Sequence, residues 1–242
     1  MQKRIGEVES YLAGSPGEIG IVLRNRQDGA VWQNSDAGTE LPAASTVKLA
    51  MVVDLLLRNQ SGQIDLSDDD WDQIDQMLHA SSDTAADQLW SEYFDGSFLS
   101  RIAGYGMPGA EFTQDPPYWG YMYCTADDLD GLIGYVLDKL PASMRTFIVG
   151  KLRSVAPDQQ FGVWGAGSRA DPGNKDGWED DSGVWMVDSV GFAGPGARYT
   201  LSMMYDLEGN GSFSDGANTL TQVAALLFRG HPTAAPTIQA TP

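Results

Sequence analysis

The segment AASTVKLAMVVDLLLRN, residues 43–59, is apolar at most positions and carries one lysine, Lys48, three residues after Ser45. Such a run predicts a helix that is buried on nearly all sides. Residues i and i+3 share a helix face, so the Ser45 hydroxyl and the Lys48 amine are expected to meet. Asp54 interrupts the run, which argues against a membrane-spanning helix. The segment therefore raises the question of why a chain would bury an ammonium group one turn from a hydroxyl.

A serine hydroxyl becomes a good nucleophile when a neighbouring base takes its proton. Lys48 can be that base if burial and nearby positive charge lower its pKa, and the apolar run at 49–57 supplies the burial. Ser45, near the helix start, also places backbone N–H groups where an oxyanion could develop. The S-x-x-K spacing by itself is weak, because a lysine that reaches solvent beside a solvated serine gives the same pattern.

Composition limits the classes of protein to consider. The chain has 242 residues, 42% of them apolar, which fits one large domain or two closely packed lobes. Fifteen Lys and Arg against 33 Asp and Glu give a formal charge of −18 without any basic run, so neither nucleic acid nor an anionic membrane surface is an expected partner. The single cysteine, Cys124, excludes an intrachain disulfide, and two histidines, His79 and His231, leave little for zinc or Ser-His-Asp chemistry.

The order of expected elements predicts the fold class. Amphipathic and turn patterns predict a helix over 1–14, strands at 18–25 and 30–34, a long helical block, three strands and a last helix at 219–228. The helices of the block are expected from Ser45 onward and at 65–78, 81–93, 97–104, 126–139 and 142–153, and the three strands at 174–178, 183–192 and 197–207. We therefore expect an α/β fold in which an antiparallel sheet is flanked by the N- and C-terminal helices and an all-helical lobe is inserted.

The same pattern predicts the domain organisation. Residues 1–230 are expected to form one domain, with an α/β lobe at 1–40 and 155–230 and a helical lobe at 41–154. Residues 231–242 are expected to be a disordered tail. The first residues lack the apolar core of a signal peptide, so the protein either stays inside the cell or is an exported domain whose leader has been removed.

Two later segments complete a set of three motifs. Ser81-Ser82-Asp83-Thr84-Ala85-Ala86-Asp87 begins an expected helix, and Lys175-Asp176-Gly177-Trp178 lies in an expected strand. With S-x-x-K at Ser45, the chain resembles the class A β-lactamase-like family of penicillin-recognising serine enzymes, whose motifs are S-x-x-K, S-D-N and K-T-G in this order. The resemblance extends over about residues 1–230. It implies a serine enzyme that forms an acyl-enzyme, takes a small-molecule or peptide acyl substrate and needs no cofactor.

The resemblance also implies a role for each matching residue. Ser45 would attack the carbonyl, Lys48 would accept its proton, and Ser81 would pass a proton to the leaving group, with Ser82 as the alternative if the register is off by one. Asp83 stands where the family has the asparagine that positions substrate and lysine. The segment from Lys175 to Gly177 would line the cleft, and the backbone N–H groups of Ser45 and Trp178 would form the oxyanion hole.

The first departure from the family concerns deacylation. The family's hydrolases carry E-x-x-x-N in a loop after the second motif, and its glutamate activates the water. The corresponding interval, 107–129, lacks this pattern and offers only Glu111 and Asp115 before Thr125. An aspartate before two prolines also suits a plain turn. Rapid turnover of β-lactams by the usual route is therefore not expected.

The second departure concerns charge. Asp83 replaces an amide, and Asp176 replaces the hydroxyl that helps the family to bind a substrate carboxylate. Carboxylates at these positions would repel a carboxylate substrate, so the cleft is expected to suit a neutral or cationic one. The alternative is that Asp176 points away from the cleft.

Two further segments match functional patterns only in part. Residues 206–217, DLEGNGSFSDGA, partly match a calcium loop but lack the bidentate glutamate at the last position, so a Gly-rich loop before the last helix is expected. The aromatic residues at 118–123 suit either a roof over the cleft or ordinary packing.

Three functions follow in order. The first is a serine hydrolase or acyltransferase that acts on an ester, amide or peptide through a Ser45 acyl-enzyme. The second is a class A-like β-lactamase with an atypical deacylation base. The third is a non-catalytic binding module on the same fold, against which the retention of Ser45, Lys48, Ser81 and Lys175 argues. The substrate and the oligomeric state are left open.

Overall fold

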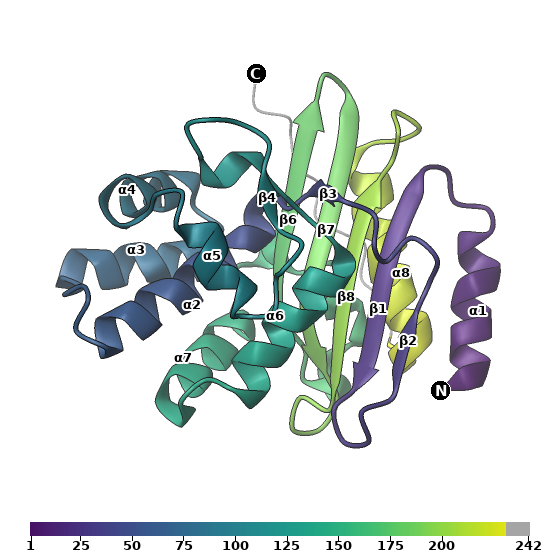
Figure 1. Cartoon of the computed structure of the whole chain (residues 1–242). Helices are drawn as coiled ribbons and strands as arrows, with labels where there is room; N and C mark the ends of the chain where they lie inside the picture. The colour runs from purple at the N-terminus through teal and green to yellow at the C-terminus, as the bar shows by residue number, and fades with distance from the viewer. Residues whose placement is uncertain (231–242) are drawn as a thin grey trace.

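The computed structural model describes residues 1–230, in which a five-stranded antiparallel sheet has the strand order β2-β1-β8-β7-β6. Its strands are β1 (Glu18–Asn25), β2 (Val31–Gln33), β6 (Gly173–Asp181), β7 (Val184–Ala193) and β8 (Tyr199–Asp206). Strand β1 pairs with β8 along its whole length, so the two ends of the chain build one sheet. Figure 1 shows that β6 forms the edge of the sheet nearest the helices of residues 47–152.

Helices cover both faces of this sheet. Helices α1 (Gln2–Leu12) and α8 (Phe213–Phe228) lie on one face, and the block from α2 to α7 lies on the other side (Figure 1). The block consists of α2 (Val47–Gln60), α3 (Asp68–His79), α4 (Asp83–Tyr93), α5 (Phe98–Ala103), α6 (Ala126–Asp138) and α7 (Ala142–Leu152). The predicted fold class is confirmed, and every helix expected in the block is present.

Side chains alternate between two hydrophobic cores on the two faces of the sheet. On β7, Val190 and Phe192 pack with the helical block, and Val187 packs with α1 and α8. Helix α2 lies inside the first core, because the residues from Val47 to Leu56 are all buried. Period-two alternation in the strands thus divides one sheet between two layers of helices.

Local capping explains where several helices begin. Ser67 with Asp70, Thr125 with Asp128 and Ser212 with Asp215 each form a reciprocal capping box at the start of α3, α6 and α8. Each box satisfies backbone N–H groups that the first turn leaves free.

One of these boxes corrects two predictions. Helix α8 begins at Phe213 and not at 219, because Ser212 and Asp215 cap it. Residues 206–217 are therefore not a single loop: Asp206 ends β8, and residues from Phe213 onward form the first turns of α8.

Several short elements were not predicted. A second sheet has the order β3-β5-β4 and consists of β3 (Leu41–Pro42), β5 (Met122–Cys124) and β4 (Glu111–Phe112). Residues 1–230 also contain five 3-10 turns, η1 (Ala44–Thr46), η2 (Trp119–Tyr121), η3 (Pro157–Gln159), η4 (Gly162–Ala166) and η5 (Ser168–Ala170). Strands of two or three residues are too short to show a period-two pattern in the sequence.

The boundaries proposed for the two lobes stay a prediction. His231 and the tail predicted at 231–242 lie outside the described residues. Among the helices at 1–230, none combines the length and the apolar character that crossing a membrane requires.

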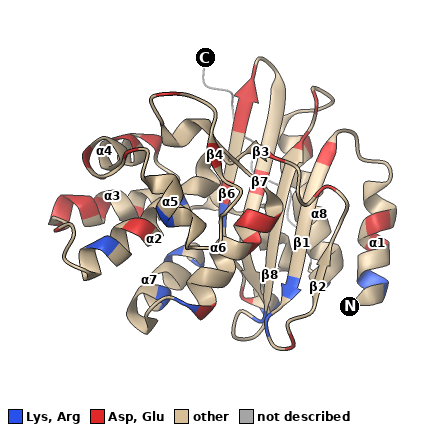
Figure 2. Ribbon diagram, in the orientation of Figure 1, with Lys and Arg blue, Asp and Glu red and all other residues tan. Residues whose placement is uncertain are grey.

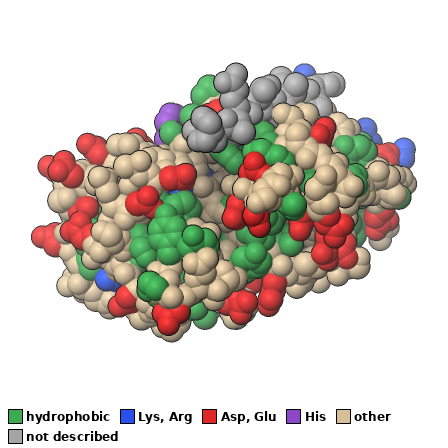
Figure 3. Space-filling view, turned by 90° about the horizontal axis from the view of Figure 1, so that it is seen from above, with side chains coloured by type: hydrophobic (Ala, Val, Ile, Leu, Met, Phe, Trp, Pro, Cys, Tyr) green, Lys and Arg blue, Asp and Glu red, His purple; other side chains and the backbone are tan. Residues whose placement is uncertain are grey.

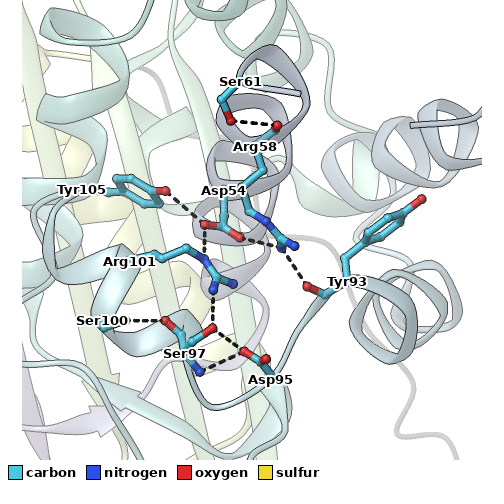
Figure 4. Close-up of polar contacts among 9 residues, drawn as sticks. All are labelled: Asp54, Arg58, Ser61, Tyr93, Asp95, Ser97, Ser100, Arg101 and Tyr105. Atoms are coloured by element: carbon cyan, nitrogen blue, oxygen red, sulfur yellow. Dashed lines mark hydrogen bonds and ion pairs between the residues drawn. The ribbon is translucent and has the colours of Figure 1, made fainter. Parts of the chain in front are cut away.

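The polar residue in the middle of α2 has a structural role, shown in Figure 4. Asp54 is 0% exposed, and its carboxylate accepts from Arg101 Nε at 2.7 Å, from Tyr105 Oη at 3.0 Å and from Arg58 Nη1 at 3.3 Å. Arg58 also donates to the carbonyl of Tyr93. One buried carboxylate therefore ties α2 to α5 and to the end of α4.

We predict that Asp54→Ala will lower the free energy of unfolding by about 3 kcal/mol, because two guanidinium groups would lose their buried anion. Urea unfolding followed by circular dichroism measures the loss. Asp95→Ala, which removes an exposed carboxylate of the same region, should change stability by less than about 0.5 kcal/mol. Equal losses in the two variants would contradict a structural role for Asp54.

Candidate active site

Ser45 lies on a tight turn and not inside the α-helix. It is the middle residue of η1, between β3 and α2, and its side chain is partly exposed. The preceding Ala44 has φ +43, a left-handed conformation that is strained for a residue with a Cβ. The turn brings Ser45 to the start of α2 with its hydroxyl accessible.

Lys48 is fully buried and has polar partners from three segments. Its Nζ lies 2.8 Å from Ser45 Oγ, 2.7 Å from the carbonyl oxygen of Ser81 and 2.5 Å from Asp83 Oδ1. The Trp119 ring lies on another side, 4.6 Å from Nζ. The expected contact between the two residues of S-x-x-K is therefore present, and the amine has 0% exposure.

Ser81 links the two lysines of the motifs. Its carbonyl accepts from Lys48, and its Oγ accepts from Lys175 Nζ at 2.8 Å. Ser81 has φ +57 and lies just before α4, where Ser82 accepts from the backbone of Ala85 as the N-cap. The alternatives for the two serines are thereby separated, because Ser82 caps the helix and Ser81 faces the lysines.

The close approach of β6 to the η1 turn depends on Gly177. A Cβ at this position would lie 2.8 Å from Ser45 N and 3.0 Å from Thr46 N, so a side chain would push the strand away from Ser45. Since β6 is an edge strand, alternate backbone N–H groups on it are free of the sheet. The glycine of the third motif is therefore required for this contact.

The alternation of β6 corrects the expectation for Asp176. Lys175 and Gly177 face the helical block, whereas Asp176 and Trp178 face α8. Asp176 is 1% exposed and accepts from Asn174 Nδ2 at 2.6 Å, and the Trp178 ring packs 5.3 Å from that of Phe213. The side chains of Asp176 and Trp178 therefore point away from Ser45, which is the alternative stated for Asp176.

Burial dominates the electrostatics of these groups. It lowers the pKa of Lys48, although the Asp83 carboxylate acts in the opposite direction. Burial, with the nearby charge of Lys48, holds the pKa of Lys175 well below its usual value. Burial also raises the pKa of Asp176 to about 7. Both lysines therefore lose their protons more readily than a solvated lysine does.

Sequence reasoning assigned no role to Asp87 and left Trp119 between a roof over the cleft and ordinary packing. Asp87, one turn after Asp83 on α4, accepts from Tyr118 Oη at 2.5 Å and from Trp119 Nε1 at 2.9 Å. These bonds hold the Trp119 indole against Lys48. The signal was the four-residue spacing between Asp83 and Asp87, which places both carboxylates on one helix face.

The candidate deacylation bases lie away from this cluster. Glu111 is exposed on β4, where it pairs with Tyr123, and Asp115 is exposed in the following turn. Within residues 1–230, no hydrogen bond or ion pair joins either carboxylate to Ser45 or Lys48. No group of three His, Cys, Asp or Glu side chains in this range could hold a metal ion.

The fold is similar to that of known proteins. A model of the β-lactamase enzyme family matches residues 2–69. Among solved structures, the one titled "Structure of PBP-A" superposes with a TM-score of 0.77 at 15% identity and covers 95% of this chain and 96% of that one. A β-lactamase from Xanthomonas campestris gives a TM-score of 0.76 at 16% identity over 94% of this chain and 96% of its own. The chain has a β-lactamase-like fold. The predicted resemblance to this family is confirmed.

A curated relative is similar in sequence. "Putative lipoprotein LppW" of Mycobacterium tuberculosis is 28% identical over 210 residues, which cover 82% of this chain. The chain spans 66% of the length of that relative.

Behind the Ser45–Lys48 pair lies a buried acid. Asp188 on β7 pairs with Gly177 across the ladder, so its side chain shares the face that approaches Ser45. It is 0% exposed, and neither carboxylate oxygen has a partner in hydrogen-bond geometry among the described residues. Burial raises the pKa of Asp188 well above its usual value, and the backbone of Tyr205 offsets only part of this rise.

We predict that Asp188→Asn will stabilise the protein at pH 7 and change little near pH 4. The raised pKa means that the folded state keeps the proton that the unfolded state releases, so the penalty grows as pH rises above the unfolded value of about 3.9. Urea unfolding at the two pH values measures the difference, which should be about 1 kcal/mol or more at pH 7. Asp68→Asn, on the exposed start of α3, is the control. A gain of equal size at both pH values would contradict the buried neutral acid.

Proposed function

We propose that the chain is a serine hydrolase or acyltransferase that works through an acyl-enzyme on Ser45. The contact of 2.8 Å between Lys48 Nζ and Ser45 Oγ supports this proposal most directly. It combines an accessible hydroxyl with an amine whose pKa burial lowers. A buried amine at this distance can accept the hydroxyl proton as the oxygen attacks a carbonyl.

The next steps use the other motif residues. As the tetrahedral intermediate forms, the N–H groups of Ser45 and Trp178 would stabilise its oxyanion. Ser81, bonded to Lys175, would donate a proton to the leaving group and recover one through the lysines. Lys48 reaches the carbonyl of the same serine, so proton acceptance and proton return lie close together.

Deacylation is expected to be slow. The space beside Lys48 is occupied by the Trp119 indole, which Asp87 holds in place. Neither Glu111 nor Asp115 interacts with the Ser45–Lys48 pair among residues 1–230. With no positioned carboxylate to activate water, the acyl group would persist until a better acceptor, such as an amine, arrives.

The charge around Ser45 favours a neutral or cationic substrate. Both lysines are buried and paired, so neither offers an exposed cation to a substrate carboxylate. The Asp83 side chain, by contrast, is 73% exposed. Figure 3, which looks onto the upper end of the molecule, shows acidic side chains on both sides of a hydrophobic patch. An ester, amide or peptide without a nearby carboxylate fits this environment better than a penicillin does.

Two alternatives are tested by the same chemistry. An atypical β-lactamase would turn over a β-lactam quickly, and a binding module would form no adduct.

The lipoprotein name of the relative from M. tuberculosis favours the exported alternative for this chain.

We predict that a fluorescent penicillin or a fluorophosphonate will label the protein at Ser45 and that the β-lactam adduct will persist. Intact-mass spectrometry over time measures the adduct and its loss. Ser45→Ala should abolish labelling while circular dichroism stays unchanged. Ser82→Ala serves as the matched control, because Ser82 caps α4 and does not contact either lysine.

Three outcomes separate the functions. Labelling of another serine would contradict the nucleophile, and the absence of any label would favour the binding module. Rapid hydrolysis of nitrocefin would put the β-lactamase first. Slow nitrocefin turnover with faster turnover of neutral p-nitrophenyl esters is the expected result.

We predict that Asp83→Asn will shift the pH dependence of acylation to lower pH. The Asp83 carboxylate raises the pKa of Lys48 against the effect of burial, so its neutral isostere should let the lysine act as a base at lower pH. The rate of labelling against pH measures the midpoint. Asp68→Asn, which removes the same charge far from the site, should leave the midpoint in place. A midpoint unmoved by Asp83→Asn would contradict Lys48 as the titrating base.

A further inference from the structure

Positive charge gathers at one end of a strongly acidic protein. Figure 2 shows acidic residues at the upper end of β6 and on α4, whereas basic residues lie along α7 and at the lower ends of β1 and β8. The chain carries a formal charge of −18 and only 15 Lys and Arg in total. The arginines at the lower end therefore form a locally positive region in an acidic chain.

A hollow of about 540 Å³ opens at this lower end, between α7, the end of α6 and the turns that follow β1 and β7. Three arginines line it, Arg26, Arg145 and Arg153, and its lining includes no acidic residue. Leu137, Val149 and Ala197 supply apolar wall. The volume lies in the range that small-molecule ligands occupy, and the mixture of cations and apolar surface suits an anion on a small organic body.

Two of the guanidinium groups converge on one oxygen. The carbonyl of Leu137 accepts from Arg26 Nη2 at 3.3 Å and from Arg145 Nη1 at 3.2 Å. Arg26 is otherwise satisfied, since it pairs with Asp138 and donates to the carbonyl of Ala197. Arg145 has no carboxylate partner within residues 1–230. The hollow therefore holds two close cations, and one of them has unused donors.

The third arginine is fixed on the same helix face. Arg145, Val149 and Arg153 recur every four residues along α7, so they form one stripe. Arg153 pairs with Asp171, lies 5.2 Å over the Phe192 ring and keeps a buried Nε without a partner in the described residues. The guanidinium groups of Arg145 and Arg153 thus lie on either side of the apolar Val149.

The floor between them is open. Gly150 lies next to this stripe, and a Cβ built on it would meet nothing within 4 Å. A glycine inside a helix lowers its stability by about 1 kcal/mol relative to alanine, and no close contact requires one here. The open surface leaves room for a ligand between the arginines.

We propose that this hollow is a binding site for a small oxyanion of the phosphate or carboxylate type, carried on a partly apolar body. Arg145 binds the anion with its free N–H donors, and Arg26 adds positive charge beside it. Arg153 contacts the end of the ligand that lies farther from Arg145. Guanidinium groups suit such oxyanions because two parallel N–H bonds match two oxygens. The site lies away from Ser45 and does not depend on the proposed acyl-enzyme.

The test uses phenyl phosphate and benzoate as anionic probes and benzyl alcohol as the neutral one. Isothermal titration on the full chain should give saturable binding of at least one anion and none of the alcohol. Arg145→Gln should weaken binding about tenfold or more, as expected for the loss of a charge-assisted contact. Comparing phenyl phosphate with benzoate distinguishes the two oxyanions, and vesicles of phosphatidylglycerol test whether a lipid headgroup supplies the phosphate.

Two variants keep the result decisive. Gly150→Glu places a carboxylate in the hollow, removes no existing contact and should abolish binding in a protein that still folds. Arg169→Gln removes one exposed arginine outside the hollow and should leave affinity unchanged. Absence of anion binding by the unaltered chain would overturn the proposal. Equal weakening by Arg145→Gln and Arg169→Gln would overturn it too, because only general electrostatics would then remain. The Ser45→Ala variant should bind the anion normally, so failure here and failure of the proposed enzyme are distinguishable.

Discussion

The burial of one ammonium group constrains the whole arrangement around Ser45. Lys48 has no exposed surface, and an isolated charge of this kind would be strongly unfavourable in a protein interior. Its contacts come from the η1 turn, from the carbonyl of Ser81 and from Asp83 at the start of α4. The helical block and the nucleophile turn must therefore assemble in one relative position for the lysine to be tolerated. The edge strand β6 completes this arrangement, because Lys175 donates to Ser81 and Gly177 lets the strand approach Ser45.

Two neighbours make this lysine differ from a simple buried base. Asp83 places a carboxylate where the resemblance leads one to expect an amide, and it favours the protonated amine. Trp119 presents its ring to the same nitrogen and is held by Asp87. Burial lowers the pKa of Lys48 and prevails over the carboxylates of Asp83 and Asp87, which raise it. The chemistry open to Ser45 thus depends on a balance between desolvation and two exposed carboxylates.

Charge is distributed along the molecule in two opposed ends. Acidic residues lie at the upper end of β6 and on α4, and the arginines of α7 and of the β1–β2 turn lie at the lower end (Figure 2). Buried polar groups between the ends serve different purposes. Asp54 is fully partnered and joins helices, whereas Asp188, which lies behind the η1 turn, has no side-chain partner among residues 1–230. The contrast shows that burial of a carboxylate does not by itself indicate function, because the partners decide what the group does.

The sequence alone determined the order of elements, the fold class and the contact between Ser45 and Lys48, because each follows from local periodicity or from spacing along one segment. The start of α8 was missed, because the sequence analysis assigned the capping pair of Ser212 and Asp215 to a loop. Only the tertiary structure decided which serine faces Lys175, that Asp176 points to the sheet face opposite Ser45, and that Trp119 covers Lys48. Side-chain direction in β6 depends on strand register, and Trp119 meets Lys48 only after α4 and the 107–124 loop have packed together. Those contacts join residues far apart in the chain, and no local pattern records them.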